Sequence, residues 1–144
     1  MHLHIRTALP SDYPAIYQLN KEEMGYDYPL EETKAKLAAL LQQEGDQIFV
    51  AVADGLVVGY LHLRDYDVLY APHMKDVMGI AVSSRYQRMG IGRALLETGE
   101  KWAIQNGAKA IRLVSGEERT GAHAFYRRCG YTSNKSQINF KKYL

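Results

Sequence analysis

The residues best placed to do chemistry form a basic turn with two glycines at residues 85–93. The turn lies between an apolar run, residues 77–82, and an amphipathic segment that begins at Ile91. A strand that enters a helix through such a turn makes an anion site, because the first N–H groups of the helix lack partners and its dipole is positive there. Gly90 and Gly92 carry no Cβ, so a phosphate can approach the backbone. The turn therefore predicts a ligand with phosphate groups.

Two common phosphate-binding patterns do not fit this chain. The dinucleotide fingerprint needs a third glycine at the position of Leu95. The nucleotide P-loop needs Gly-x4-Gly-Lys-Ser/Thr, but Gly116 and Gly121 are followed by Ala122 and His123, which offer neither the lysine nor the metal-binding hydroxyl. A nucleotide-binding protein is therefore only a weak alternative.

A third pattern, Gln/Arg-x-x-Gly-x-Gly/Ala, fits at every position, with Gln87, Arg88, Met89, Gly90, Ile91 and Gly92. This turn resembles the acyl-CoA pyrophosphate turn of the GNAT acetyltransferases. Residues 122–131 resemble the same superfamily's later signature, Ala-x-x-Phe-Tyr-x-x-x-Gly-Phe/Tyr. The two motifs stand in the expected order, so the resemblance covers the whole chain.

The overall composition indicates an ordinary globular protein. With 144 residues, 47% of them hydrophobic and 24% charged, the chain is expected to form one domain, residues 1–144. Eighteen basic and 16 acidic residues give a net charge of +2, too small to favour nucleic acid as a partner. A single cysteine, Cys129, and the lack of a signal core or membrane-length apolar run predict a cytoplasmic protein that does not bind membranes.

The elements that must position these motifs can be read from apolar periodicity. Strands are expected at residues 2–9, 47–53, 56–63, 76–82 and 109–115, helices after residues 10–12 and 29, at 91–103 and at 120–129, and a final hairpin at 131–143. The pattern predicts a mixed α/β (α+β) fold with helices on both faces of a central sheet. By resemblance, this is a GNAT-type, mostly antiparallel sheet.

The resemblance also implies roles for individual residues. The strand at Ile80, Ala81 and Val82 would pair with the pantetheine arm of acetyl-CoA, the acyl donor, and one of its N–H groups would hold the developing oxyanion. The backbone amides from Gln87 to Arg93 would bind the pyrophosphate. Tyr126 matches the tyrosine that protonates the leaving thiolate in many relatives.

Arg119 departs from the family pattern, because relatives often carry asparagine seven residues before the tyrosine. It would reach a phosphate or a carbonyl of CoA, or else point to solvent. Asp76 lies where several relatives carry a catalytic glutamate and would act through water as the general base, with a solvated strand-end carboxylate as the alternative. His73 and His123 are weaker candidates for this base. His2 and His4 fit alternation along a strand, and no cluster has metal-ligand spacing, so we expect no metal.

The expected acceptor is a primary amine of a small molecule or a peptide. Segments that usually build the acceptor pocket interleave carboxylates with tyrosines, which suits a cation; they are Glu22, Glu23, Tyr26, Asp27, Tyr28, Glu31, Glu32, Asp65, Tyr66, Asp67 and Tyr70. The amine would attack the thioester directly in a ternary complex. The alternative is a non-catalytic acyl-CoA-binding sensor or interaction module on the same fold. Residues 137–144 suggest, by resemblance, a homodimer.

Overall fold

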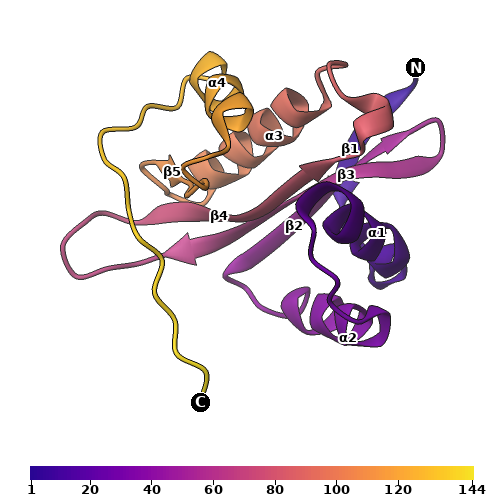
Figure 1. The fold of residues 1–144 in the computed structure, drawn as a ribbon, viewed down its shortest axis with the longest axis horizontal. Helices are drawn as coiled ribbons and strands as arrows, with labels where there is room; N and C mark the ends of the chain where they lie inside the picture. Colours follow the sequence, from indigo (N-terminus) through magenta and orange to yellow (C-terminus); the bar gives the residue numbers. More distant parts are fainter. The chain divides into compact units, whose positions relative to one another are not determined.

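The computed structural model describes residues 1–144 and divides them into two compact units, residues 1–113 and 114–144. The first unit holds a sheet and most of the helices (Figure 1). Its elements are β1 (Leu3–Thr7), η1 (Pro10–Asp12), α1 (Tyr13–Met24), α2 (Leu30–Leu40), β2 (Asp46–Ala53), β3 (Leu56–Tyr66), β4 (Met74–Val82), η2 (Ser84–Tyr86), α3 (Ile91–Gln105) and β5 (Ile111–Arg112). None of the helices is both long and apolar enough to cross a bilayer.

The five strands form one sheet in the order β1-β2-β3-β4-β5. Neighbouring strands are antiparallel except for β4 and β5, which are parallel and pair only at Lys75 with Ile111 and Asp76 with Arg112. The β2–β3 hairpin turns at Asp54 and Gly55, both with positive φ, as the Asp-Gly pair predicts. The expectation of a mixed, mostly antiparallel sheet is confirmed.

Side-chain alternation gives the sheet two buried faces. Ile48, Val50, Val52, Tyr60 and Ala81 pack in one core with Ile16 and Leu19 of α1 and Leu37 of α2. The intervening residues face the other way, where Gly99 of α3 lies against Leu61 and Leu63 of β3. Helices therefore cover both faces, as expected (Figure 1).

An irregularity in β4 decides which of its side chains share a face. His62 of β3 pairs with Gly79, whereas Leu63 pairs with Val77, so Met78 is an extra residue in β4. Such a bulge shifts the alternation by one residue. As a result, Asp76 and Gly79, three residues apart, both lie on the face covered by α1 and α2.

The second unit contains α4 (Thr120–Arg128), which ends before Gly130 at φ +95. No strand follows it, so the prediction of a hairpin at residues 131–143 is wrong. Ile138 and Phe140 alternate as a strand would, but they are 79% and 86% exposed, and an alternating segment forms a strand only where one face is buried and its backbone is paired. The homodimer expected through residues 137–144 stays a prediction.

Two further boundaries differ from the sequence-based expectations. The strand expected at residues 109–115 is reduced to Ile111–Arg112, because only these residues pair with β4. The connecting loop before β4 is shorter than expected, because β3 continues to Tyr66 and β4 begins at Met74. Pairing across the sheet, which local composition does not encode, sets both limits.

Candidate active site

The glycine turn has the backbone geometry of an anion site. Arg88 and Gly90 both adopt positive φ, +65 and +79, and Gly90 is the N-cap of α3. No side chain caps this helix, so its first N–H groups remain available to a ligand. Alternating right- and left-handed residues point successive N–H groups into one concavity, and anions bind there.

The residues present also fit the pyrophosphate of CoA. A Cβ built at Gly90 meets nothing within 4 Å, so the space above the turn is open to a ligand. Arg85, Arg88 and Arg93 are exposed around it and can bond phosphate oxygens. Ile91 is buried and anchors the start of α3. The predicted residues 87–93 thus lie together: residues 87–90 form the turn between η2 and α3, and residues 91–93 begin α3.

The strand that precedes this turn, β4, offers an unpaired backbone edge. Its pairing with β5 stops at Asp76, so residues 77–82 have a strand neighbour on the β3 side only. Ile80, Ala81 and Val82 lie in this part, directly before the turn. An extended ligand can add to such an edge as an extra strand would.

A row of charged side chains crosses the α1–α2 face at the start of β4. Asp76 Oδ1 accepts a hydrogen bond from Arg112 Nη1 at 3.0 Å, and the Arg112 guanidinium lies 4.2 Å from the centroid of the Tyr66 ring. Burial raises the pKa of Asp76, although the positive charges of Arg112 and Arg64 oppose this shift. Asp76 is therefore a partly buried carboxylate held in an ion pair.

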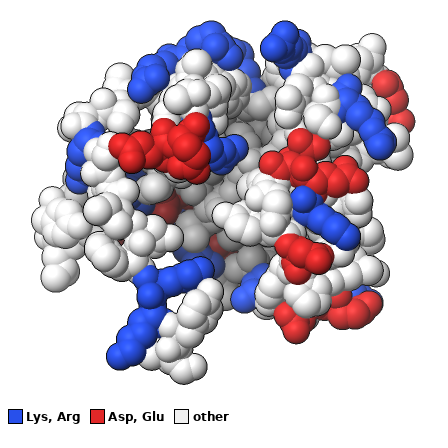
Figure 2. Space-filling view, viewed as in Figure 1, with Lys and Arg blue, Asp and Glu red and all other residues white.

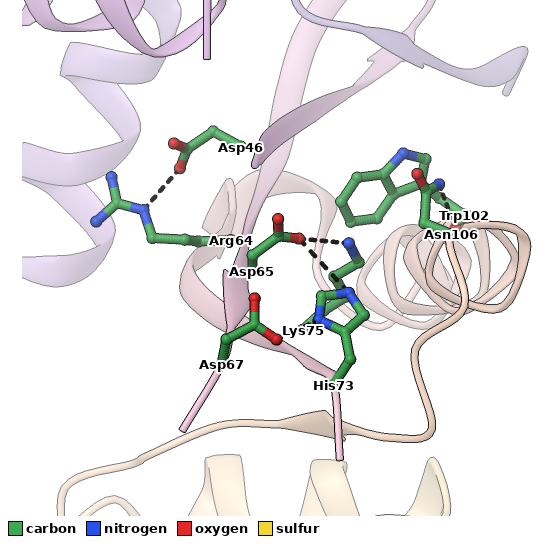
Figure 3. A network of polar contacts seen from close by, with 8 residues as sticks. All are labelled: Asp46, Arg64, Asp65, Asp67, His73, Lys75, Trp102 and Asn106. Carbon is green, nitrogen blue, oxygen red and sulfur yellow. Dashed lines mark hydrogen bonds and ion pairs between the residues drawn. The ribbon is translucent and has the colours of Figure 1, made fainter. Parts of the chain in front are cut away.

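The same row continues through a cluster that sequence analysis missed. Asp46, at the start of β2, accepts a hydrogen bond on Oδ1 from His62 Nε2 at 2.7 Å. The same oxygen accepts a hydrogen bond from Arg64 Nε at 2.9 Å (Figure 3). Arg64 is the cross-strand partner of both Asp46 and Asp76. The sequence did contain a signal for this cluster. Tyr60, His62 and Arg64 occupy every second position, so they share one face of the strand.

The expected acceptor segments are largely exposed. Figure 2 shows Asp and Glu side chains among lysines where α1 and α2 lie. Tyr26 and Tyr28, in the α1–α2 connection, are exposed, and Tyr17 donates a hydrogen bond to Asp27 at 3.2 Å. Beneath them, the Tyr60 hydroxyl bonds Asn20 Oδ1 at 2.5 Å, and burial raises the pKa of Tyr60. Glu23 accepts a bond from the Ser84 amide at 2.9 Å and so joins α1 to the turn.

His73 lies apart from this face. Its Nδ1 bonds Asp67 Oδ1 at 2.7 Å, and its Nε2 lies 3.7 Å from Asp65 Oδ1, which also bonds the buried Lys75 (Figure 3). The side chains of Asp65 and Lys75 point toward Trp102 of α3. These contacts hold the β3–β4 connection, and His73 is not brought together with Asp76.

The second unit holds Tyr126, the expected acid, in α4. Its ring lies 5.4 Å from that of Phe125 and 6.3 Å from that of Tyr131, centroid to centroid. Burial raises the pKa of Tyr126, and the positive charge of Arg119, the N-cap of α4, opposes that rise. His123 bonds the Gly116 carbonyl at 2.9 Å through Nε2, which is a structural use of its ring.

Comparison with known proteins identifies the family of this chain. The model of the acetyltransferase (GNAT) family matches residues 13–131, which include the glycine turn and Tyr126. The chain belongs to the GNAT acetyltransferase family. It is a GNAT-family N-acetyltransferase.

Individual relatives cover nearly the whole chain. An aminoglycoside N(6')-acetyltransferase type 1 from Stenotrophomonas maltophilia is 32% identical over 145 residues, covering 95% of this chain and 91% of that protein. A putative acetyltransferase from Agrobacterium tumefaciens has a TM-score of 0.85 at 25% identity, covering 96% and 99% of the two chains. The structure of AAC(6')-Iy with a CoA-based bisubstrate analogue has a TM-score of 0.88 at 19% identity, covering 100% of both chains.

Proposed function

We propose that this protein transfers the acetyl group of acetyl-CoA to a primary amine of a small molecule. The observation that carries the proposal is the uncapped start of α3, with Arg88 and Gly90 in left-handed conformations, directly beyond the open edge of β4. The turn would take the pyrophosphate and the edge would take the pantetheine arm. Two structures of the same fold hold CoA or a CoA-based analogue, which supports CoA as the ligand.

The open part of β4 also suits the thioester. A backbone N–H of Ile80 or its neighbours would bond the thioester carbonyl and stabilise the oxyanion. Tyr126 would donate its proton to the departing thiolate. Transfer from a phenol of ordinary pKa ~10 to a thiolate whose thiol has a pKa of ~8.5 is uphill by about 2 kcal/mol, so the step would depend on the proton that the amine nitrogen releases to restore the tyrosine.

The acceptor is proposed to be cationic. Carboxylates and tyrosines lie exposed on α1, α2 and their connection, which suits an ammonium group through ion pairing and cation–π contact. The name of the 32% identical relative makes aminoglycoside amines the first acceptors to test. The amine must also lose a proton on this face. The family pattern suggests Asp76, acting through water, as the general base that takes this proton.

The test combines ligand-induced stability with turnover. Acetyl-CoA and CoA, but not NAD or ATP, should raise the melting temperature; a ligand at 100 times its Kd adds about 2.7 kcal/mol. Release of free thiol should then depend on an added amine, across aminoglycosides, polyamines, amino acids and peptides. Stabilisation by CoA without turnover on any amine would favour the sensor function, and stabilisation by ATP alone would contradict the assignment of the turn.

The order of the reaction can be tested with the same assay. Direct attack requires both substrates to be bound together, so initial-rate lines at several amine concentrations should intersect. Parallel lines, or acetyl transfer to the protein from labelled acetyl-CoA without amine, would indicate a covalent intermediate instead. Cys129 lies at the C-cap of α4, where the helix dipole does not favour a thiolate.

A further inference from the structure

A second pair of groups on the α1–α2 face has the arrangement of an oriented base. Asp46 is buried, with a side chain only 3% exposed, and its Oδ1 takes the hydrogen bonds of both His62 and Arg64. The His62 side chain is 14% exposed and bonds Asp46 through Nε2. The carboxylate thus fixes the orientation of the imidazole ring.

This bond also selects the tautomer of His62. An ionised carboxylate can only accept hydrogen bonds, so Nε2 carries the proton and Nδ1 carries the lone pair. No protein group bonds Nδ1. A carboxylate that holds one nitrogen of an imidazole and leaves the other basic is the arrangement that activates histidine as a base.

The position of His62 places this base next to the open part of β4. His62 and Gly79 are cross-strand partners, which puts their Cα atoms about 5 Å apart. Gly79 has no side chain of its own, and the Tyr60 ring occupies the space beside it, since a Cβ at Gly79 would lie 3.1 Å from the Tyr60 hydroxyl. Ile80, whose N–H is proposed to hold the thioester carbonyl, is the next residue along β4.

Asp76 is less suited to take the proton at neutral pH. Although burial raises its pKa, its Oδ1 is already engaged in an ion pair with Arg112 Nη1 at 3.0 Å, so the carboxylate is not presented to a substrate as a bare base. The pKa of His62 is lowered by burial, with Asp46 opposing and Arg64 adding to the shift, so the ring is neutral at pH 7. The charged groups around His62 are Asp46 on β2, Arg64 on β3 and, one pair further along the sheet, Asp76 on β4.

We propose that His62, oriented by Asp46, accepts the proton of the acceptor amine. The inference rests on the proposed acetyl transfer. The ammonium group gives one proton to Nδ1, and the nitrogen lone pair then attacks the thioester carbon. The C–S bond breaks and Tyr126 protonates the thiolate; the second proton lost by the nitrogen passes through water to restore the Tyr126 hydroxyl, and His62 returns its proton to water.

The experiment compares His62→Gln with His4→Gln, an exposed histidine on β1. For an amine that the wild-type protein acetylates, His62→Gln should lower kcat/KM about 100-fold or more at pH 7, the usual range for a general base. His4→Gln should leave it unchanged. The KM for acetyl-CoA and the stabilisation by CoA should stay normal in both, which shows that the variant is folded.

The pH profile and the amine series distinguish a base from a structural residue. The wild-type rate should level off above the pKa of His62, whereas the rate of His62→Gln should keep rising with pH as the amine itself becomes neutral. Acceptors of low amine pKa, already neutral at pH 7, should recover most of the lost rate. Asp46→Asn should lower the rate and shift the pH at which the rate levels off.

Two outcomes would overturn the proposal. The first is a His62→Gln protein with the wild-type rate and pH profile. The second is an Asp76→Asn protein whose rate no longer levels off with pH, while the rate of His62→Gln still does. Failure of the proposed function is distinguishable, because it would show as no amine-dependent thiol release by the wild-type protein.

Discussion

The ammonium of Lys75 lies 4.4 Å from the centroid of the Trp102 ring and 2.5 Å from Asp65 Oδ1, so one cation joins β4, α3 and the end of β3. The Lys75 side chain is 4% exposed. Lys75→Ala should lower the free energy of unfolding by about 2 kcal/mol, less than for a fully buried pair because Asp65 is partly exposed. Urea denaturation measures this loss.

Two companion variants separate charge from packing at this position. Lys75→Met keeps an apolar stem against the Trp102 ring and should lose less than Lys75→Ala. Lys101→Ala, at an exposed position of α3, should change stability by less than about 0.5 kcal/mol. Equal effects of Lys75→Ala and Lys101→Ala would show that the cation contributes nothing to stability.

The glycine turn can be tested with two matched substitutions. Gly90 and Gly107 flank α3 with φ of +79 and +78, and a Cβ at either position meets nothing within 4 Å. Each change to alanine should therefore cost a similar backbone strain, about 1 kcal/mol of stability. Only Gly90→Ala should raise the KM for acetyl-CoA, by about tenfold, because its methyl group enters the proposed pyrophosphate site. A parallel rise in Gly107→Ala would mean that strain, not ligand contact, is being measured.

Tyr126 and Arg119 should affect different kinetic quantities. Tyr126→Phe should lower kcat about 100-fold with unchanged CoA binding, since only proton donation is lost. The Arg119 charge lowers the pKa of Tyr126, so Arg119→Ala should move the alkaline limb of the kcat profile to higher pH. Arg127→Ala, exposed on the same helix, is the control. If Arg119 instead bonds CoA, the KM for acetyl-CoA will rise and the limb will stay in place.

Acid stability should depend on Asp12. Its carboxylate forms two bonds with Arg6, at 2.8 and 3.0 Å, and accepts the Leu9 amide at 2.7 Å. Burial alone would raise the pKa of Asp12, but these bonds outweigh it, and the folded pKa lies below the ordinary 3.8. The stabilisation is therefore present above pH 3.8 and is lost as pH falls through the folded pKa.

Asp12→Asn should accordingly lower stability by about 1 to 2 kcal/mol at pH 7. The difference from the wild-type protein should shrink below pH 3.8, because protonated Asp12 also loses its charged bonds. Thermal unfolding between pH 2.5 and 7 measures both values. A difference that stays constant over this range would contradict the role of ionisation.

Much of the fold was predictable because its signals are local. The turn at residues 87–92, the helix that follows it and the Asp54–Gly55 hairpin depend on glycine conformations and on apolar periodicity within single segments. The two motifs that led to the family are of the same kind. The predicted ends of strands were less accurate, since the end of a strand depends on pairing with the neighbouring strand rather than on local composition.

The candidate base was not predictable in this way. Asp46 and His62 are 16 residues apart, and their contact depends on the register of β2 against β3. The bulge at Met78, which brings Gly79 opposite His62, has a glycine beside it, but that glycine alone does not tell which residue of the strand is unpaired. At residues 131–143 the alternation misled the prediction, because a strand also needs a partner that a sequence pattern does not supply.

The extra residue in β4 has a consequence for how such a protein can diversify. Met78 separates two stretches of one strand: residues 74–77, whose side chains set the charge row, and residues 79–82, whose backbone would meet the acyl donor. Substitutions in the first stretch can remodel acceptor preference without displacing the second. Deleting Met78 would restore regular alternation, with Asp76 still opposite Arg64 and two positions from Gly79 on the same face, so a loss of length here would straighten β4 without turning its charge row over.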